Sequence, residues 1–467
     1  MTLSFPRRLT TTSPVLSPSE LQALAKELLD LTSGDTASVS IDHRAMGTAR
    51  VARGEIRLNE SGDWLGVTLS TQFGHRVPMS LNINQLDRNR LRQAIAYVDR
   101  IAREQPGDPI ETTMPIAPQH YGSNTAWKES TLAAFFDGRH AAARMLAEPV
   151  INAKLTGAAF IGVWVHSRCV ANKQGLCAAG LETDAELTVT AWNADGKGRG
   201  WAGQAARDWD TLRPDHVAQE AIRLTRLAAN PQVVEPGRRT AILGPAAVAQ
   251  LVCKMGTAFD AQSVLEGAGP LYDRRANRVR FNERILDARL TLSSDPNDPE
   301  GGYLPFNTGA YPLVAMTWLG KGAVLENLAY RAYFAAERGI TPSNDPPESF
   351  RMGGGTTSIE EMIANCKDGI YVNRVADVEV VRDGTGLTGV TNGGCYLIRN
   401  GKIDRSVRDF RFVESPWFFL NRLIAVGPTA RASFGYSPWQ GGWPAAPTIV
   451  PPMMIRDFNF VALAEAV

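Results

Sequence analysis

The sequence predicts an α+β fold, with an α/β-layered N-terminal region of antiparallel strands and a C-terminal, mainly antiparallel β region. Up to about Pro236, segments that alternate apolar and polar residues lie between amphipathic helical segments. From Ala288 onward, short apolar segments are separated by Gly and Pro turns. The 10 tryptophans and 28 prolines favour many packed loops over a helical bundle. A helix-flanked layer followed by dense short strands is typical of an α+β protein.

Residues 1–120 are expected to form an N-terminal α+β domain that begins and ends with helices. The segment SPSELQALAKELLDLT opens the first helix, because Ser17 and Glu20 supply an N-terminal cap ahead of regularly spaced leucines. Period-two alternation then predicts antiparallel strands, and apolar residues at helical spacing predict a second helix. The strands are expected within 37–45, 48–61 and 63–84, and the helix within 86–106.

Residues 121–235 are expected to form a middle α+β domain after a proline-containing connector. A hairpin is predicted to turn between Asn193 and Gly196, and Asp215 is expected to cap the helix that follows. The other expected elements are a helix within 130–153 and a strand and turn within 158–175.

Residues 236–467 are expected to form a C-terminal β-rich domain. Its first element is a strand that turns at Gly244-Pro245 into a helix, in the segment TAILGPAAVAQLVCKM. Proline suits the first position of a helix, where its missing N–H costs nothing. Further helices are expected within 324–339, 358–369 and 417–426.

Charge and cysteine content exclude several classes of protein. With 49 basic and 48 acidic residues the net charge is +1, so no overall field favours nucleic acid or an anionic membrane. No run approaches 18 apolar residues, and the first residues do not form a signal peptide. Five scattered cysteines fit reduced thiols in a cytosolic chain better than a disulfide framework. A cytoplasmic location is therefore expected.

Motifs for common catalytic chemistries are missing from the sequence. No His is followed by Glu, so neither HExxH nor HExxxH occurs, and there is no G-x-S-x-G. His166 and Cys169 are three residues apart on a predicted strand, so their side chains should lie on opposite faces. The glycines of RMGGGTTSIEEM lack the lysine of a Walker loop. The segment SSDPNDPEGGY lacks the last glutamate of an EF-hand and is expected to be a rigid acidic loop.

Several segments, in order, resemble the TldD/PmbA (TldE) family of peptide-processing metallopeptidase subunits. They are RVARGEIRLNESGDWLGVTLST, CVANKQGLCAAGLETDAELTVTAW, EPGRRTAILGPAAVAQLV, FRMGGGTTSIEEMIANCKDGIYV and CYLIRNGKI followed by NRLIAVG. Two elements depart from the family pattern: the family's acidic fDdEG reads Phe306-Asn307-Thr308-Gly309, and Glu414-Ser415-Pro416 replaces an expected Gly-Asn step.

The resemblance implies a subunit without its own zinc site. In TldD-type subunits the HExxxH helix follows a strand similar to RRTAIL, and a cysteine near the C-terminus completes the zinc shell. Here the matching helix reads Ala246 to Leu251 without a His, Cys, Asp or Glu, and PTARASFGYSPW has no cysteine. This chain is therefore similar to the TldE/PmbA partner: no catalytic residue and no metal ligand is expected in it, and zinc is expected in a TldD-like catalytic subunit.

The expected partners are that subunit and a peptide substrate, without nucleic acid or membrane. The candidate peptide-binding residues are Arg351, Gly353, Gly354 and Gly355, which alternatively serve only to pack backbone against backbone. A dimer is expected through the β-rich half, where SPWQGGWPAAPTIVPPMM carries Trp439, Trp443, Met453 and Met454; a wrap over the chain's own core is the alternative.

Three functions stay open at this stage. The first is the non-catalytic subunit of a heterodimeric metallopeptidase that processes unfolded or modified peptides. The second is a stand-alone peptide-binding homodimer. The third is a hydrolase whose site contains no zinc and is not recognised from sequence.

Overall fold

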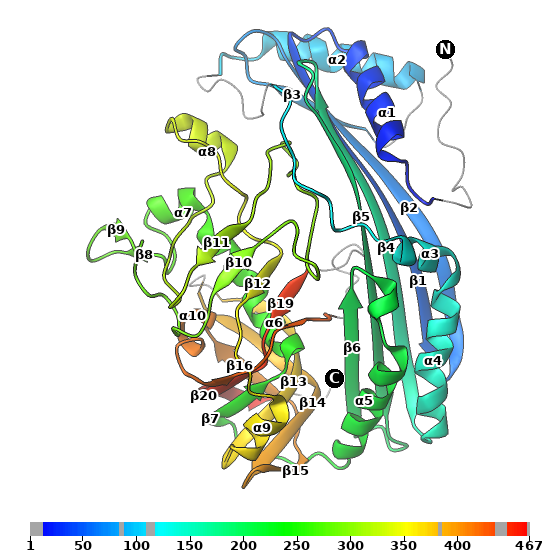
Figure 1. Ribbon diagram of the computed structural model, residues 1–467, viewed down its shortest axis with the longest axis vertical. Helices are drawn as coiled ribbons and strands as arrows, with labels where there is room; N and C mark the ends of the chain where they lie inside the picture. The colour runs from blue at the N-terminus through cyan, green and yellow to red at the C-terminus, as the bar shows by residue number, and fades with distance from the viewer. Residues whose placement is uncertain (1–12, 84–87, 109–116, 382–384, 435–445, 465–467) are drawn as a thin grey trace.

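The N-terminal part of the molecule is built on one long antiparallel sheet. The computed structural model describes residues 13–83, 88–108, 117–381, 385–434 and 446–464. Within them the strands of this six-stranded sheet lie in the order β3-β2-β1-β4-β5-β6 (Figure 1). Their bounds are β1 Thr36–Ala52, β2 Glu55–Gln72, β3 Met79–Ile83, β4 Thr156–Asn172, β5 Cys177–Trp192 and β6 Arg199–Ala206.

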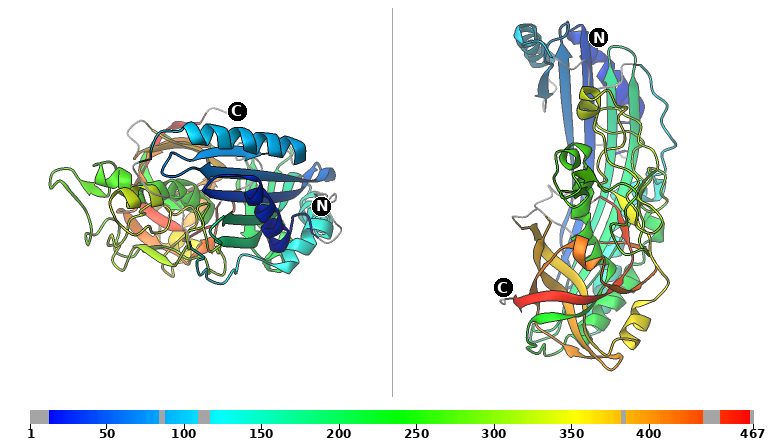
Figure 2. Two further views of the ribbon diagram at one scale, coloured as in Figure 1. Left: turned by 90° about the horizontal axis from the view of Figure 1, so that it is seen from above. Right: turned by 90° about the vertical axis from the view of Figure 1, so that its left-hand side faces the viewer.

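Four of these strands are unusually long. β1, β2, β4 and β5 contain 17, 18, 17 and 16 residues. At a rise of about 3.3 Å per residue each spans about 55 Å. This length gives the molecule its elongated outline (Figure 2). A hairpin was predicted between Asn193 and Gly196, and β5 and β6 do turn there.

Helices cover one face of the long sheet. α1, α3, α4 and α5 pack along its outer face (Figure 1), and α2 packs over β2 and β3. Side chains at odd positions of β4, among them Val163 and Cys169, lie in the apolar clusters under these helices. His166 lies on the opposite face, so the predicted divergence of His166 and Cys169 is confirmed. The helix bounds are α1 Pro18–Leu31, α2 Arg88–Glu104, α3 Glu129–Asp137, α4 Arg139–Asn152 and α5 Pro214–Leu227.

The first helix begins as its sequence indicates. Ser17 accepts a hydrogen bond from the Glu20 N–H, and Glu20 reaches back to the main chain of Ser17. The expected cap of α5 is wrong, because Arg213 is the N-cap residue and Asp215 lies in the first turn. Pro214 occupies the first helical position, so the helix starts two residues earlier than a cap at Asp215 would place it.

The expected regions 1–120 and 121–235 contribute to the same sheet. β1 pairs with β4 from Ser38 opposite Asn172 to Ala52 opposite Ala158. Separate sheets would leave two long strand edges unpaired, with rows of main-chain donors and acceptors exposed. Joining the edges satisfies these groups and makes one layer of the two segments.

The C-terminal region is mainly antiparallel, which confirms the predicted α+β class. A seven-stranded sheet follows the order β13-β7-β20-β16-β14-β15, β17 joins β20, and β13 also pairs with β14, which closes a ring. A second sheet has the order β11-β10-β12-β19-β18. The bounds are β7 Gly237–Leu243, β10 Leu292–Ser294, β11 Met316–Leu319, β12 Phe350–Met352, β13 Asp368–Val380, β14 Leu387–Arg399, β15 Lys402–Ser406, β16 Phe410–Glu414, β17 Leu423–Val426, β18 Ala430–Arg431, β19 Thr448–Val450 and β20 Met453–Leu463.

Helices in this region are shorter than expected. α9 (Ile359–Ala364) has the capping box of Ser358 and Glu361 that its sequence suggests. Within 324–339, however, only α8 (Ala332–Glu337) is helical. Within 417–426 a four-residue helix, α10 (Pro416–Phe419), gives way to β17, because β17 pairs with β20. Pairing with a distant strand outweighs the local helical pattern here.

In the part of the chain that the structure describes, no helix has the length and apolar character needed to cross a membrane.

Replacing Phe412 with alanine should strongly destabilise the C-terminal ring of strands. Phe412 is fully buried on β16, with its ring centroid 5.7 Å from that of Phe458. Removing such a side chain costs about 3–5 kcal/mol through lost burial and an unfilled cavity. V413A is the matched control, because Val413 is the next residue on β16 and is 39% exposed. Urea unfolding measures the difference; equal losses for the two variants would contradict this account of the core.

Candidate functional site

The strand–helix corner between β7 and α6 (Pro245–Val252) is apolar and buried. Gly244 is the N-cap residue and Pro245 occupies the first helical position, as predicted. From Ala246 to Leu251 every side chain except that of Gln250 is buried. The helix therefore packs into the core of the C-terminal region.

The residues at this corner do not fit a zinc ion. Zinc needs three or four N, S or O ligands, and alanine, valine and leucine offer none. Cys253, one turn on, donates its Sγ–H to the Gln250 carbonyl at 3.4 Å, and burial raises its pKa, which favours the neutral thiol over the thiolate. Across the described ranges, no three His, Cys, Asp or Glu side chains are grouped so as to hold a metal ion.

Two cavities open between the long sheet and the C-terminal region. The first, here called the β6 cavity, has a volume of about 550 Å³ and lies against β6, the N-terminal end of α6 and residues 429–433. The second, here called the sheet cavity, has a volume of about 520 Å³ and lies between β4 and β5 and the loops 303–308 and 344–349. Arg207 lines both. Both are within the usual size of ligand pockets.

β6 is an edge strand whose outer main-chain groups face the β6 cavity. The Asn193 N–H donates to the Gly198 carbonyl at 3.1 Å, which fixes the alternation of hydrogen-bonded pairs along β5 and β6. Trp201, Gly203 and Ala205 consequently direct their N–H and C=O groups away from β5. The Trp201 carbonyl accepts a hydrogen bond from Asn373 Nδ2 at 2.8 Å. Among the described residues, no partner satisfies the outer groups of Gly203 and Ala205.

A row of charged side chains crosses the inner face of the sheet. His166 directs Nδ1 to Glu182 at 2.7 Å and Nε2 to Asp42 at 2.8 Å, so a ring protonated on both nitrogens satisfies both carboxylates. Asp42 also accepts a hydrogen bond from Arg168 Nε at 2.9 Å. The sheet brings these residues together, because Arg168 lies opposite Asp42 and Glu182 opposite His166 in register.

Both carboxylates that contact His166 have lowered pKa values. Burial by itself raises the pKa of Asp42 and of Glu182. Hydrogen bonds and charge from His166 outweigh burial, with Arg168 helping at both and Arg207 at Glu182. They lower the pKa of Glu182 to about 2 and hold that of Asp42 below its usual range. Both groups are therefore anionic at neutral pH.

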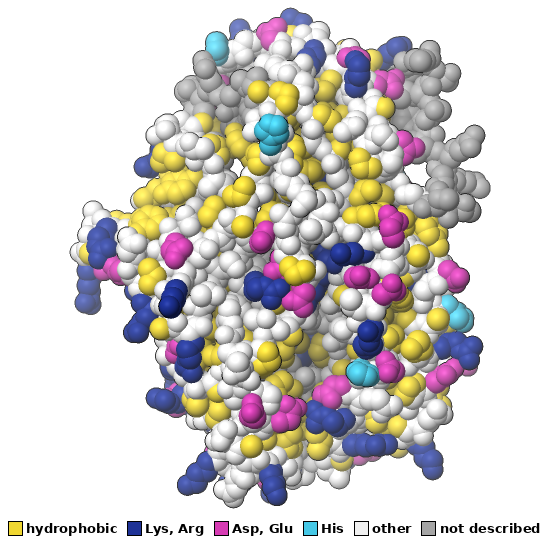
Figure 3. Space-filling view, viewed as in Figure 1, with side chains coloured by type: hydrophobic (Ala, Val, Ile, Leu, Met, Phe, Trp, Pro, Cys, Tyr) yellow, Lys and Arg dark blue, Asp and Glu magenta, His cyan; other side chains and the backbone are white. Residues whose placement is uncertain are grey.

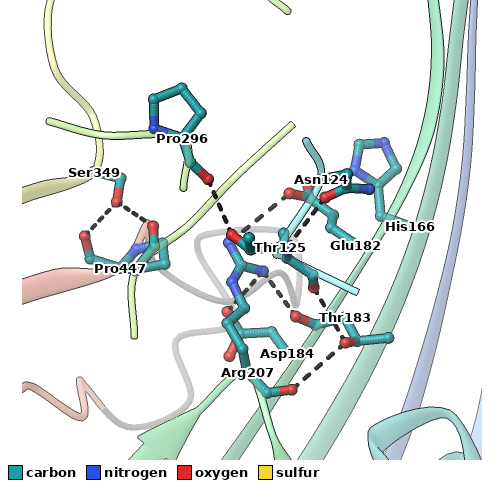
Figure 4. Close-up of polar contacts among 12 residues, drawn as sticks. Asn124, Thr125, His166, Glu182, Thr183, Asp184, Arg207, Pro296, Ser349 and Pro447 are labelled. Atoms are coloured by element: carbon teal, nitrogen blue, oxygen red, sulfur yellow. Dashed lines mark hydrogen bonds and ion pairs between the residues drawn. The ribbon is translucent and has the colours of Figure 1, made fainter. Parts of the chain in front are cut away.

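A buried ion cluster joins the sheet to the C-terminal region. Asp184 on β5 accepts two hydrogen bonds from Arg431 Nη2 at 2.6 and 2.7 Å, and Arg207 Nη1 lies 3.3 Å from the same carboxylate. The side chains of Asp184, Arg207 and Arg431 are 4, 7 and 6% exposed. Arg207 also donates to the Thr183 carbonyl at 2.8 Å (Figure 4).

On the molecular surface, basic and acidic side chains are interspersed in the middle of the face shown in Figure 3.

The predicted candidate Arg351 is held by the acidic loop. Its Nε and Nη2 donate to Asp298 at 2.7 and 2.9 Å, and Nη2 also contacts Glu300 at 2.7 Å. The expected rigid acidic loop thus has a defined partner, and these charges raise the pKa of Arg351 above its ordinary value.

The three predicted glycines lie where backbones approach closely. The Gly353 N–H donates to the Thr291 carbonyl at 2.9 Å and the Gly355 N–H to the Gly427 carbonyl at 2.7 Å. A methyl group at Gly354 or Gly355 would overlap a carbonyl of the 426–427 segment. Neither Arg351 nor these glycines line the two cavities described above. Packing accounts for their positions, and a role in peptide binding stays a prediction.

The sequence reasoning did not single out Asp184, Arg207 or Arg431. One signal for Asp184 was available: Glu182, Asp184 and Glu186 alternate within an otherwise apolar strand, on the face away from the helices. The arginines lie at the end of β6 and in a short C-terminal strand, and no local pattern marks them. Of the expected interface residues, Met453 and Met454 pack in the protein's own core, and Trp439 and Trp443 lie outside the described residues.

Comparison with known proteins agrees with this architecture. The sequence profile of the PmbA/TldA metallopeptidase C-terminal domain matches residues 236–462. A metalloprotease of Archaeoglobus fulgidus is 24% identical over 264 residues, which are 53% of this chain and 60% of that protein. The match thus spans less than two thirds of that relative.

The fold is shared with several solved structures. TldE from Thermococcus kodakarensis aligns with a TM-score of 0.78 at 16% identity, over 94% of this chain and 99% of that one. A putative modulator of DNA gyrase from Thermotoga maritima aligns with a TM-score of 0.76 at 15% identity, over 94% and 98%. A second putative modulator of DNA gyrase, from Bacteroides thetaiotaomicron, aligns with a TM-score of 0.73 at 16% identity, over 94% and 99%.

These findings place the chain in a class of metallopeptidase-like proteins with a long antiparallel sheet and a β-rich C-terminal domain. Residues 236–462 match the PmbA/TldA metallopeptidase C-terminal domain and the chain shares the fold of TldE, which supports the TldD/PmbA resemblance of its sequence segments.

Replacing Glu182 with glutamine should weaken the dependence of the free energy of unfolding on pH at acidic pH. Because the pKa of Glu182 is lowered from 4.5 to about 2, its carboxylate stabilises the fold fully above pH 4.5. That contribution is lost as the pH falls from 4.5 through 2. At pH 7, E182Q should lower the free energy of unfolding by about 3 kcal/mol, because His166 and Arg207 lose a partly buried anionic partner.

Urea unfolding between pH 7 and pH 2 measures this effect. The exposed Glu337 of α8 supplies the control E337Q, which should keep the wild-type slope. A slope for E182Q as steep as the wild-type slope between pH 4.5 and 2 would show that the Glu182 contacts do not stabilise the fold.

Proposed function

We propose that this chain is the TldE/PmbA-like, non-catalytic subunit of a heterodimeric TldD/TldE-type zinc metallopeptidase that processes unfolded or modified peptides in the cytoplasm. The observation that carries the proposal is the α6 corner. It keeps the strand–helix geometry at which TldD-type subunits are expected to hold zinc, while its side chains from Ala246 to Leu251 supply no metal ligand and no general base. A TldD-like partner supplies the zinc ion, and this chain contributes a wall of the space in which peptide is cut.

The β6 cavity supports a role in gripping extended peptide. The outer N–H and C=O groups of Gly203 and Ala205 are where an added strand would form its hydrogen bonds, and strand addition is a common way to bind peptide without reading its sequence. Since β6 lies next to the N-terminal end of α6, a peptide bound there passes the corner where the family's chemistry is expected.

A stand-alone peptide-binding protein is the second candidate. It is favoured by the same edge strand, because the outer main-chain groups of Gly203 and Ala205 could pair with a peptide without a second protein. The two candidates differ in whether peptide cleavage appears when a TldD-type protein is added.

The isolated chain should bind no stoichiometric zinc and cleave no peptide, and it should gain peptidase activity only as a complex with a TldD-type protein. Elemental analysis, light scattering and a peptide-cleavage assay on each protein and on the mixture measure this. C253S, which removes the thiol nearest the corner, should leave the zinc content and activity of the complex unchanged. One zinc per isolated chain together with cleavage by that chain would overturn the assignment, and two monomers in the mixture would overturn the assembly.

Replacing Ala205 with proline should weaken binding of extended peptides. Proline removes the outward N–H of residue 205, and it leaves the hydrogen bonds between β5 and β6 intact because those involve the neighbouring residues. We expect a loss of about tenfold in affinity, the equivalent of one main-chain hydrogen bond. A205S keeps the N–H and is the matched control. Fluorescence anisotropy of a labelled peptide reports the affinity, and equal binding by the two variants would exclude strand addition at β6.

A further inference from the structure

The sheet cavity has two walls of different electrostatic character. One wall is the inner face of β4 and β5 with His166, Arg168, Glu182 and Asp184. The facing wall is formed by the loops 303–308 and 344–349, which carry Asp345 and Glu348. Arg207 lines both this cavity and the β6 cavity, so the two cavities lie next to each other at the end of β6.

The cations that line the sheet cavity already have anionic partners. Arg168 and Arg44 lie 2.9 and 3.6 Å from Asp42, and Arg207 lies 3.3 Å from Asp184. His166 contacts two carboxylates. An anion that entered the cavity would therefore have to compete with ion pairs that are buried and well aligned.

Among the described residues, the carboxylates of the facing wall have no cationic partner. Asp345 accepts a hydrogen bond from Asn307 Nδ2 at 2.9 Å, which leaves its second oxygen available. Glu348 is exposed, and within the described residues neither carboxylate lies within 4 Å of an Arg, Lys or His nitrogen. Among the described side chains that line this cavity, the carboxylates without an ionic partner thus lie on the loop 344–349.

The remaining lining suits an aliphatic chain with a charged end. Trp164, Phe306 and Leu313 supply apolar surface, and Pro346, Pro347 and Pro447 add rigid apolar surface. Lysine and arginine side chains combine an apolar stem with a cationic head, so they bury the stem against such surface while the head meets a carboxylate.

We propose that the sheet cavity is a specificity pocket for a cationic group of the bound peptide, which Asp345 and Glu348 recognise. This inference rests on the proposed function, because it takes the peptide to lie along β6. Strand addition supplies sequence-independent affinity at β6, and the pocket selects one side chain or the amino terminus of the peptide.

Binding of matched octapeptides to the full chain tests the pocket. The peptides alternate serine and threonine, are acetylated and amidated, and carry lysine, norleucine or glutamate at one central position. We expect the lysine peptide to bind about tenfold more tightly than the norleucine peptide, the ratio that one charge-assisted hydrogen bond typically gives, and the glutamate peptide most weakly. Fluorescence anisotropy with a label at the C-terminal end reports the affinities.

The variant D345N/E348Q should lose this preference while it binds the norleucine peptide as the wild type does. E348Q alone changes an exposed side chain, leaves the Asn307 contact intact, and should reduce the preference about threefold. D404N alters an exposed carboxylate on β15, outside both cavities, and is the control that keeps the full preference. A preference unchanged in D345N/E348Q would overturn the pocket.

A norleucine peptide with a free amino terminus separates the two sources of the cation. Tighter binding of this peptide than of its acetylated form, abolished in D345N/E348Q, assigns the pocket to the amino terminus; a lysine preference assigns it to a side chain. Equal binding of all the peptides refutes the pocket and leaves strand addition standing. No binding of any peptide, by the chain alone or in complex, refutes both the pocket and the proposed function.

Discussion

The arrangement of the whole molecule depends on the carboxylate of Asp184, which Arg207 and Arg431 share. Asp184 belongs to the long sheet, Arg207 follows its edge strand, and Arg431 belongs to the C-terminal region. The three side chains are almost fully buried, so removing one would leave an uncompensated charge in a medium that solvates it poorly. The cluster thereby fixes the position of the segment 429–433 against β6. The β6 cavity owes one of its walls to that position.

The two faces of the long N-terminal sheet have different roles. The outer face is apolar and the inner face carries polar and charged groups. The outer face is buried under helices and stabilises the layer through apolar contact. On the inner face, charges that would be costly alone are paired across neighbouring strands, from Asp42 through His166 to Glu182. Because each of these charges already has a partner, an anion that entered the cavity would have to compete with an existing ion pair. Among the described residues that line the cavity, the carboxylates without a cationic partner lie on the facing loop.

Local signals predicted some elements well and others poorly. Three features were predicted correctly: the capping box at Ser17, the turn after Trp192 and the Gly244-Pro245 corner. Each depends on interactions among a few adjacent residues, which can be read directly from the sequence. The segment 417–426 has an equally helical pattern, yet half of it becomes β17 because β20 offers it a strand edge. The expected cap at Asp215 was wrong by two residues, since Pro214 already supplies the first helical position and Arg213 is the cap.

The sequence by itself determined the α+β class, the opposite faces of His166 and Cys169, the absence of metal-binding side chains at the α6 corner and the resemblance to the TldD/PmbA family. These follow from side-chain chemistry and from periods of two and 3.6 residues, which are local properties. Only the tertiary structure decided that residues 1–120 and 121–235 share one sheet. It also brought Arg207 and Arg431 to Asp184, and it left Asp345 and Glu348 facing the sheet with no cation beside them among the described residues. Those outcomes depend on contacts between residues up to 247 positions apart, which no periodicity in a single sequence encodes.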